Sequence, residues 1–341
     1  MSILNDDWFR DLANTSKPPV RSLEPATLPR TRRGEWKPDG YLPDEGLADA
    51  MRVALILRKP LLLTGEPGTG KTECASYLAW KLNYGERLIF EAKSNSEARD
   101  LFYTYDTLGR FHAKEGGGQA PDARGFIHYN ALGEAILQTR KREEVASVVP
   151  PEGWTHRGPA QSVVLIDEID KAPRDFPNDL LNEIDRLYFK IPELRNEVVD
   201  ASKGFEPVLV ITSNSEKNLP AAFLRRCIYY HIPFPEGRLD KIVASRLPEF
   251  EDAEAALLRE SVSFFMYLRS GRAAVEKPPA TAELLDWLLY LTQRGAKLGV
   301  GLRDQAELVE PSLVTLLKHE RDQRRKSQLW EEWKTSQKSQ S

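Results

Sequence analysis
Apolar residues recur at helical spacing over residues 43–59, and Pro60 separates this predicted helix from an apolar strand at 61–64. A loop with three glycines follows the strand and leads into a second helical stretch at 72–82. The pattern predicts the order helix, strand, glycine loop and helix. A glycine-rich loop directly after a buried strand indicates that the backbone of the loop binds a ligand.

Two further apolar runs, QSVVLIDEIDKA at 161–172 and FEPVLVITSN at 205–214, predict buried strands that end in polar residues. Beyond residue 235 the pattern changes to helical spacing. Pro278 and Pro279 precede the third helix of this region, and we expect Thr281 to cap it. The three predicted helices cover 237–247, 252–270 and 281–295.

The two ends of the chain carry other patterns. Residues 1–40 hold several prolines and an arginine cluster at 30–33, which predict an extended N-terminal arm. The segment 321–341 mixes charges of both signs, and such a charged tail is usually a solvated helix end followed by disorder. Because Trp330 and Trp333 lie three residues apart, on one helical face, a docking peptide is the alternative.

Composition sets limits on this picture. The chain has 341 residues, 41% of them hydrophobic, which is enough for one large domain and a smaller one. Its 48 basic and 51 acidic residues nearly cancel, so no global basic footprint for nucleic acid appears. Cys74 and Cys227 match no metal-ligand spacing, and we expect both to be reduced. Without a secretory leader pattern or an apolar run of membrane length, a soluble cytoplasmic protein is expected.

The glycine loop satisfies GxxxxGK[ST], with a strand before it and a helix after it, as the motif requires. Glycines let successive N–H groups turn toward phosphate oxygens, and the following helix adds the positive end of its dipole. Lys71 is expected to reach the β- and γ-phosphates, and the Thr72 hydroxyl to take a Mg²⁺ ligand position. The loop therefore predicts a nucleoside triphosphate site, with an ordinary glycine turn as the alternative. Its residues are Gly65, Glu66, Pro67, Gly68, Thr69, Gly70, Lys71 and Thr72.

The later strands end in groups suited to phosphoryl chemistry. Asp167 is expected to hold Mg²⁺ through its water shell, and Glu168 to orient and deprotonate the attacking water. Asn214, at a strand tip, could bond both that water and the γ-phosphate. Arg225 and Arg226 follow a short helical segment, and an arginine at a subunit border can neutralise charge on a neighbour's γ-phosphate. The alternatives are that the acid pair lies on a solvated loop, that Asn214 is an ordinary turn residue, and that the two arginines are surface residues.

Taken in order, GEPGTGKT, LIDEIDKA, VITSN and LPAAFLRRC resemble an AAA+ ATPase of the MoxR family over residues 41–235, closest to its CoxD-like branch. The resemblance implies an α/β P-loop fold, with a parallel five-stranded sheet sandwiched by helices. It also implies a small all-α lid at 236–320, with ATP and Mg²⁺ bound between the two. A homo-oligomeric ring, usually hexameric, completes each site with a residue of the next subunit.

The resemblance also assigns individual roles. Arg226 fits the arginine-finger position better than Arg225. The other assignments are the phosphate loop at 65–72, Asp167 as the magnesium acid, Glu168 as the catalytic base and Asn214 as the first sensor.

The lid departs from the family pattern. Many relatives place an arginine, the second sensor, early in the third lid helix, where this chain has Thr281, Ala282 and Glu283. Lys277 or Arg272 could substitute from the preceding loop.

Two insertions lie where the family contacts its clients. The first, HAKEGGGQAPDARGF, holds glycines 116–118, which suggest a mobile tip. The second, at 187–211, alternates like a β-hairpin with Pro192 near its bend. Ornamental surface loops are the alternative.

The resemblance implies a ring that hydrolyses ATP to remodel or activate a protein partner. That partner would carry a von Willebrand factor A domain, and the outcome would be metallocofactor insertion or complex assembly. An alternative is an NTP-driven motor subunit of a nucleic-acid-targeting restriction or defence system, but the pI near 6.1 and the absence of a dense basic face argue against it. A non-enzymatic nucleotide switch is the third hypothesis, and the intact acid pair fits it poorly. The phosphate loop cannot itself distinguish ATP from GTP, because it contacts only phosphates.

Overall fold

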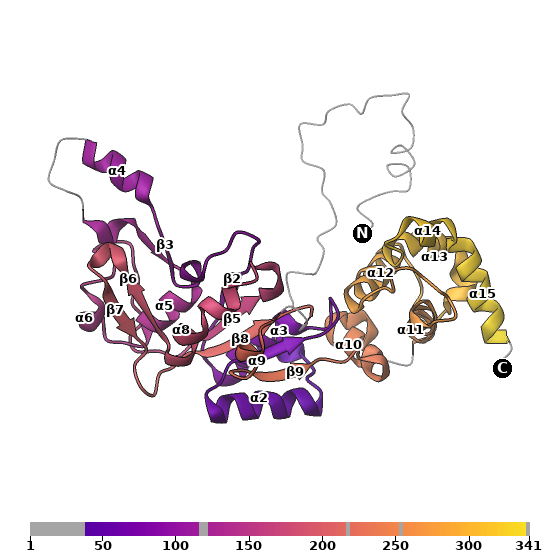
Figure 1. Cartoon of the computed structure of the whole chain (residues 1–341). Helices are drawn as coiled ribbons and strands as arrows, with labels where there is room; N and C mark the ends of the chain where they lie inside the picture. Colours follow the sequence, from indigo (N-terminus) through magenta and orange to yellow (C-terminus); the bar gives the residue numbers. More distant parts are fainter. Residues whose placement is uncertain (1–37, 116–121, 216–218, 252–254, 339–341) are drawn as a thin grey trace. The chain divides into compact units, whose positions relative to one another are not determined.

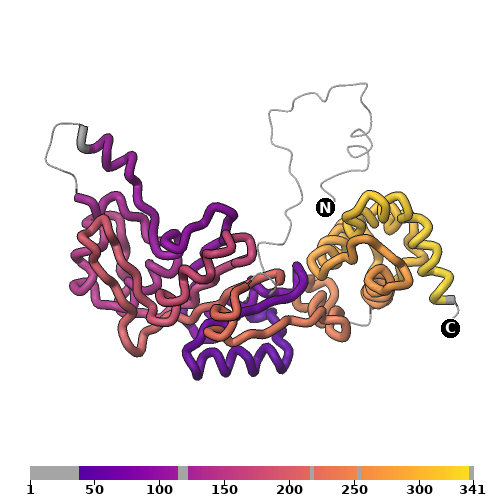
Figure 2. Tube along the Cα trace, viewed as in Figure 1, coloured from indigo at the N-terminus to yellow at the C-terminus, as the bar shows by residue number. Residues whose placement is uncertain are grey.

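A computed structural model gives the fold of the chain in Figures 1 and 2. The predicted arm up to residue 37, with its arginine cluster, and the glycine tip at 116–118 lie outside the described residues. The residues that the structure describes belong to one compact unit. The residues that the structure describes are 38–115, 122–215, 219–251 and 255–338.

Five strands form the central sheet, in the order β2-β5-β8-β1-β9, and all four pairings are parallel. This sheet confirms the predicted fold class. Because parallel strands run in the same direction, their carboxyl ends meet at one edge, where ligands bind in open α/β sheets. The strands are β1 (Leu61–Thr64), β2 (Leu88–Glu91), β5 (Val163–Asp167), β8 (Val208–Thr212) and β9 (Ile228–His231).

Helices flank the sheet. α2 contacts β1 and β9, α3 contacts β5 and β8, and α5 contacts β2 and β5. α2 begins where the Asp44 carboxylate accepts the N–H of Leu47 at 2.7 Å, a side-chain cap that satisfies a helix-end donor. The helices of this part are α2 (Glu45–Leu57), α3 (Lys71–Leu82), α5 (Ala131–Gln138), α6 (Arg142–Val145), α7 (Phe176–Asp179), α8 (Leu181–Arg186) and α9 (Ala221–Leu224). The single-turn 3₁₀ helices are η2 (Pro38–Gly40), η3 (Ala98–Leu101), η4 (Ala123–Phe126), η5 (Ile169–Lys171) and η6 (Pro192–Leu194).

Both insertions are antiparallel hairpins. In the first, β3 (Tyr103–Tyr105) pairs with β4 (Ile127–Tyr129), and α4 (Thr107–Glu115) follows β3. The second pairs β6 (Tyr188–Ile191) with β7 (Glu197–Asp200) around η6, which confirms the hairpin predicted with Pro192 at its bend.

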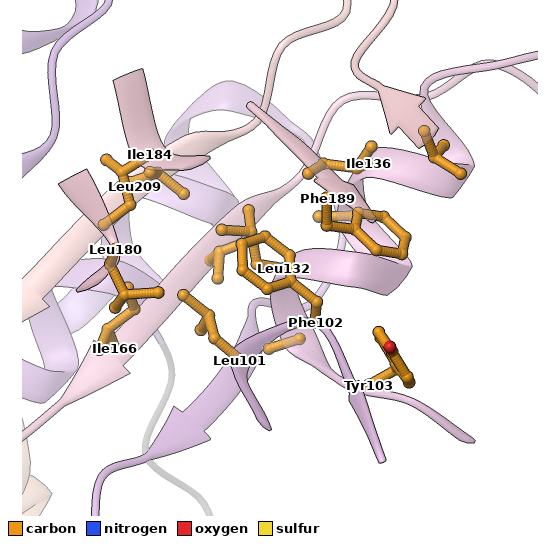
Figure 3. Packing of buried hydrophobic residues seen from close by; sticks show 14 of the residues in the cluster. Leu101, Phe102, Tyr103, Leu132, Ile136, Ile166, Leu180, Ile184, Phe189 and Leu209 are labelled. Carbon is orange, nitrogen blue, oxygen red and sulfur yellow. The ribbon is translucent and has the colours of Figure 1, made fainter. Parts of the chain in front are cut away.

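The two hairpins share the buried core. Phe102 stacks on Phe189 with ring centroids 5.3 Å apart, and Tyr103 also lies against Phe189. Figure 3 shows these rings beside Leu132 and Ile136 of α5. Apolar packing therefore fixes the base of each hairpin to the sheet.

A second apolar core holds the helical region after residue 235. Phe264, Trp287, Trp330 and Trp333 are buried there, and the rings of Trp330 and Trp333 stack at 5.0 Å. The charged segment predicted as a solvated tail is thus different in the structure. Its tryptophan face packs on Phe264, so the helix belongs to this helical region, which is called the lid below. The helices are α10 (Leu239–Arg246), α11 (Ala256–Arg269), α12 (Thr281–Gln293), α13 (Ala306–Ser312), α14 (Glu320–Arg324) and α15 (Lys326–Lys338), with 3₁₀ turns η7 (Glu236–Arg238), η8 (Pro248–Phe250), η9 (Leu302–Gln305) and η10 (Leu313–Thr315).

The N-terminal cap of α12 differs from the prediction. Thr281 is the first residue of α12 and Ala280 is its N-cap, so Thr281 does not cap the helix as predicted. Glu283 takes over part of the capping, because its carboxylate accepts the Ala280 N–H at 2.9 Å.

Cys74 and Cys227 are free and buried. Within the described ranges, none of the helices has both the length and the apolar character needed to cross a bilayer.

Candidate functional site
The loop between β1 and α3 has the backbone that a phosphate cradle needs. Gly65 and Gly70 have φ angles of 147° and 88°, a region that residues with a Cβ rarely adopt. A Cβ on Gly65 would lie 2.7 Å from the carbonyl oxygen of Ile232, and one on Gly70 would lie 3.0 Å from the ring of Tyr41. No side chain among the described residues caps α3, so the N–H groups of its first turn are available to an anion.

Lys71, the first residue of α3, directs its ammonium group into this loop. Nζ donates to the carbonyl oxygens of Gly65 at 2.8 Å and Glu66 at 3.0 Å. Burial lowers the pKa of Lys71, although nearby carboxylates, led by Asp170, act in the opposite direction. A phosphate oxygen would bind this buried ammonium more strongly than neutral carbonyls do, because a hydrogen bond between two charged groups is stronger.

Asp167, at the carboxyl end of β5, is held by two hydroxyl groups. Thr72 Oγ1 lies 3.0 Å and 3.2 Å from its two carboxylate oxygens, and Thr212 Oγ1 donates to Oδ1 at 2.6 Å. The same Thr212 hydroxyl accepts the Glu168 N–H at 2.8 Å. Sequence reasoning missed Thr212 as a site residue. Its signal is a buried hydroxyl at the end of the strand that neighbours the acid pair.

Glu168 follows β5 in a left-handed backbone conformation, φ 53° and ψ 51°, which is uncommon for a residue with a side chain and often marks a functional site. One carboxylate oxygen lies 3.4 Å from the side-chain amide of Asn214, and the other pairs with the ammonium of Lys171. This pairing raises the pKa of Lys171. The Asn214 N–H also donates to Asp170 at 3.1 Å. The structure thus brings the predicted base and the predicted first sensor together.

The two candidate finger arginines follow α9. Arg226 pairs with Asp185 of α8 and donates to the Ala222 carbonyl at 3.2 Å, while its side chain stays 35% exposed. Arg225 is exposed, and among the described residues its side chain makes no hydrogen bond or ion pair. In the described part of the chain neither arginine contacts the phosphate loop.

A lid arginine contacts the phosphate loop. Arg269, at the end of α11, donates from Nη2 to Glu66 Oε2 at 2.7 Å and from Nη1 to the Pro279 carbonyl at 2.7 Å. Its guanidinium carbon lies 3.5 Å from the ring centroid of Phe234, and only 10% of the side chain is exposed. Three contacts therefore fix this cation beside the loop.

Arg269 was not among the residues considered for the second sensor. The expected place, Thr281–Glu283, supplies no arginine. Lys277 and Arg272 are exposed, and neither side chain contacts the loop in the parts of the chain that are described. An arginine in the last turn of a helix is usually explained by the helix dipole, which is why the pattern alone did not single out Arg269.

These residues fit a nucleoside triphosphate with Mg²⁺. The loop offers N–H groups and a buried ammonium, while Thr72 and Asp167 offer hard oxygen donors of the kind that Mg²⁺ prefers. When bound, Mg²⁺ would neutralise charge on the phosphates. Within the described residues no cluster of three or more His, Cys, Asp or Glu could hold a metal on its own, so phosphates and water would complete the coordination.

Comparisons with known proteins agree with this site. Residues 60–227 match the family model of the AAA domain, dynein-related subfamily, and this range contains the phosphate loop, the acid pair and Asn214. No curated protein matches the chain by sequence. Two point mutants of RuvB from Thermotoga maritima are similar among solved structures, at 16% and 15% identity with TM-scores of 0.45 and 0.40. These alignments cover 82% and 78% of this chain and 72% and 65% of the RuvB chains, and at such scores the likeness carries no functional weight.

Proposed function
We propose that this chain, an ATP hydrolase whose residues 60–227 form an AAA domain, works in a cytoplasmic ring, as MoxR-type ATPases do, to remodel a protein partner. The observation that carries the proposal is the meeting of Lys71, Asp167 and Glu168 at one edge of the sheet, beside an uncapped helix N-terminus. A homo-oligomer, with six subunits as the expected number, is part of the proposal.

The chemistry assigned to this site is hydrolysis of a phosphoanhydride. Glu168 accepts a proton from water, for which its carboxylate must leave the ammonium of Lys171. Thr212 contacts the backbone N–H of Glu168 and the carboxylate of Asp167 at once, so one hydroxyl helps to position both residues. Lys71 binds phosphate charge after exchanging its carbonyl partners.

Exposed apolar side chains on the two insertions support a protein client. Leu108 and Phe111 of α4 are 71% and 58% exposed, and Val198 of β7 is 51% exposed. In Figure 1 α4 follows β3 and lies away from the five-stranded sheet. Apolar groups in such positions suit a protein surface and not a phosphate backbone, which basic side chains would bind. We propose a client with a von Willebrand factor A domain, on the basis of the MoxR resemblance.

Steady-state ATP hydrolysis by the full-length protein tests the enzyme part. Lys71→Ala should abolish ATP binding, whereas Glu168→Gln should bind ATP and fail to turn it over. Added DNA or RNA should leave the rate unchanged. Stimulation by nucleic acid would favour the motor hypothesis, and turnover that survives Glu168→Gln would refute the assigned base.

Co-expression of two inactive variants tests the ring. A Glu168→Gln subunit lacks the base and keeps Arg226, while an Arg226→Ala subunit has the reverse defect. In a mixed ring, the Arg226→Ala subunit has an intact base and receives the finger from its Glu168→Gln neighbour, so activity should return. If mixed rings form and stay inactive, Arg226 does not act across the interface; Arg225→Ala then tests the second choice.

A further inference from the structure
The edge strand β2 leaves backbone groups unpaired. It pairs with β5 alone, as the sheet order shows, and Figure 1 places both strands together. Ala92, just after β2, donates its N–H to the Asp167 carbonyl at 3.0 Å. The backbone N–H and C=O groups of successive residues point to opposite sides of a strand. Those of Leu88 and Phe90 therefore point toward β5, and those of Ile89 and Glu91 point outward. No hydrogen bond from these outward N–H groups is present among the described residues.

A cleft of about 700 Å³ lies along this free edge. One wall is β2 and the loop after it, and the other is formed by the base of the β3–β4 hairpin and the start of α5. A volume of this size is within the range of sites for drug-sized ligands or short peptide segments. The residues that matter here are Ile89, Glu91, Lys93, Asp100, Tyr129 and Glu134.

The charges in the cleft favour a positively charged occupant. Glu91, Asp100 and Glu134 contribute three carboxylates against the single ammonium of Lys93. Asp100 and Glu134 accept hydrogen bonds from neutral groups, which leave their charges in place. Glu91 is exposed, and no side chain in the described ranges is paired with it. Phosphates and nucleic acid would be repelled.

The geometry points to a docking site for an extended peptide segment of a protein partner, carrying lysine or arginine at alternate residues. Its backbone adds a strand to β2 by pairing with Ile89 and Glu91, which is the β-augmentation mode of peptide recognition. Alternate side chains of an added strand lie on one face, so basic residues at every second position meet the carboxylates of Glu91 and Asp100. The exposed side chain of Ile89, 46% accessible, lines the same cleft and offers apolar contact to the peptide.

Fluorescence anisotropy tests the site with the full-length protein and no nucleotide, so the outcome does not depend on ATP turnover. The probe is a fluorescein-labelled peptide of alternating threonine and lysine. Glu91→Lys should weaken its binding by about tenfold. The same peptide N-methylated at alternate residues keeps its charge and loses strand pairing, so it should also bind about tenfold more weakly. A peptide of alternating threonine and glutamate should not bind.

Two control variants distinguish strand addition at β2 from diffuse electrostatic attraction and from occupancy of the cleft by the chain's own arm. Glu307→Lys makes the same charge change on α13 and should leave affinity unchanged; an equal loss would mean diffuse electrostatic attraction and would overturn the site. Equal binding of the N-methylated peptide would overturn the added strand. The full-length triple variant Arg30→Gln, Arg32→Gln and Arg33→Gln should bind the probe as the wild type does. Tighter binding by that variant would show that the chain's own arm is the occupant and not a partner.

Discussion
Removing the guanidinium of Arg269 should disconnect the lid from the phosphate loop. The side chain reaches Glu66 of the loop on one side and is held on the lid side by the Pro279 carbonyl and the Phe234 ring. Arg269→Ala deletes all three contacts, whereas Glu66→Gln weakens only the contact with the loop. The pair of variants therefore separates the stability of the lid from its coupling to the loop.

The solvent exposure of each contact sets the free energy that Arg269 contributes. Glu66 has a 53% exposed side chain, so its ion pair with Arg269 is screened by water and contributes about 0.5–1 kcal/mol. The hydrogen bond to Pro279 contributes about 1–2 kcal/mol. Stacking on Phe234 adds about 1 kcal/mol. Only the first contact reaches the loop, so Arg269→Ala should lower lid stability by about 2–3 kcal/mol but kcat/KM for ATP by only about fivefold.

A double-mutant cycle measures this coupling. We expect Arg269→Ala and Glu66→Gln each to lower kcat/KM by about fivefold, and the double variant to be no worse than Arg269→Ala, a coupling of about 1 kcal/mol. Arg272→Ala, an exposed arginine on the same lid, is the matched control and should behave as wild type. Losses that simply add in the double variant would refute the coupling, as would full activity of Arg269→Ala with a correctly folded lid.

Three other predictions address the site, the lid core and the cysteines. Thr212→Val keeps the shape of the side chain but leaves Asp167 Oδ1 and the Glu168 N–H without this partner, so Mg²⁺-dependent ATP turnover should fall about tenfold. Thr212→Ser keeps the hydroxyl and should retain activity. An active valine variant would contradict the role given to the hydroxyl. Trp333→Ala should destabilise the protein by about 3–5 kcal/mol in urea unfolding, because the ring is fully buried, whereas Trp80→Ala, with the ring 48% exposed, should cost much less. Burial raises the pKa of the Cys74 and Cys227 thiols from 9.0 to about 12, so a thiol reagent at neutral pH should modify both only after unfolding. Since unfolded thiols ionise first, the stability linked to them is complete below pH 9.0 and is lost as pH rises toward 12; unchanged stability across that interval would contradict the shift.

Local signals explain how much of the molecule could be predicted from its sequence. The phosphate loop requires glycine at positions with positive φ, and this requirement appears as a motif because few other residues tolerate it. The acid pair was found because it ends a buried strand. Thr212 and Arg269 were missed because their roles depend on neighbours distant in the sequence: β8 lies beside β5, and the end of α11 lies against Glu66. The terminal tryptophans were assigned to a solvated tail because their partner, Phe264, lies far back in the chain.

Glu66 joins the phosphate loop to the lid through two different groups. Its backbone carbonyl accepts the Lys71 ammonium at 3.0 Å, and its carboxylate accepts Arg269 at 2.7 Å. The same carbonyl also accepts the Thr69 hydroxyl at 2.8 Å. When Lys71 leaves the carbonyl for a phosphate, we expect the loop to shift at Glu66 and the lid to respond through the carboxylate that Arg269 holds. Glu66→Gln keeps the carbonyl and removes the charge, so ATP affinity, measured by equilibrium titration, should remain within about twofold of wild type while kcat falls. If ATP affinity fell instead and kcat were preserved, the carboxylate would serve the loop directly, and the lid would not respond through this residue.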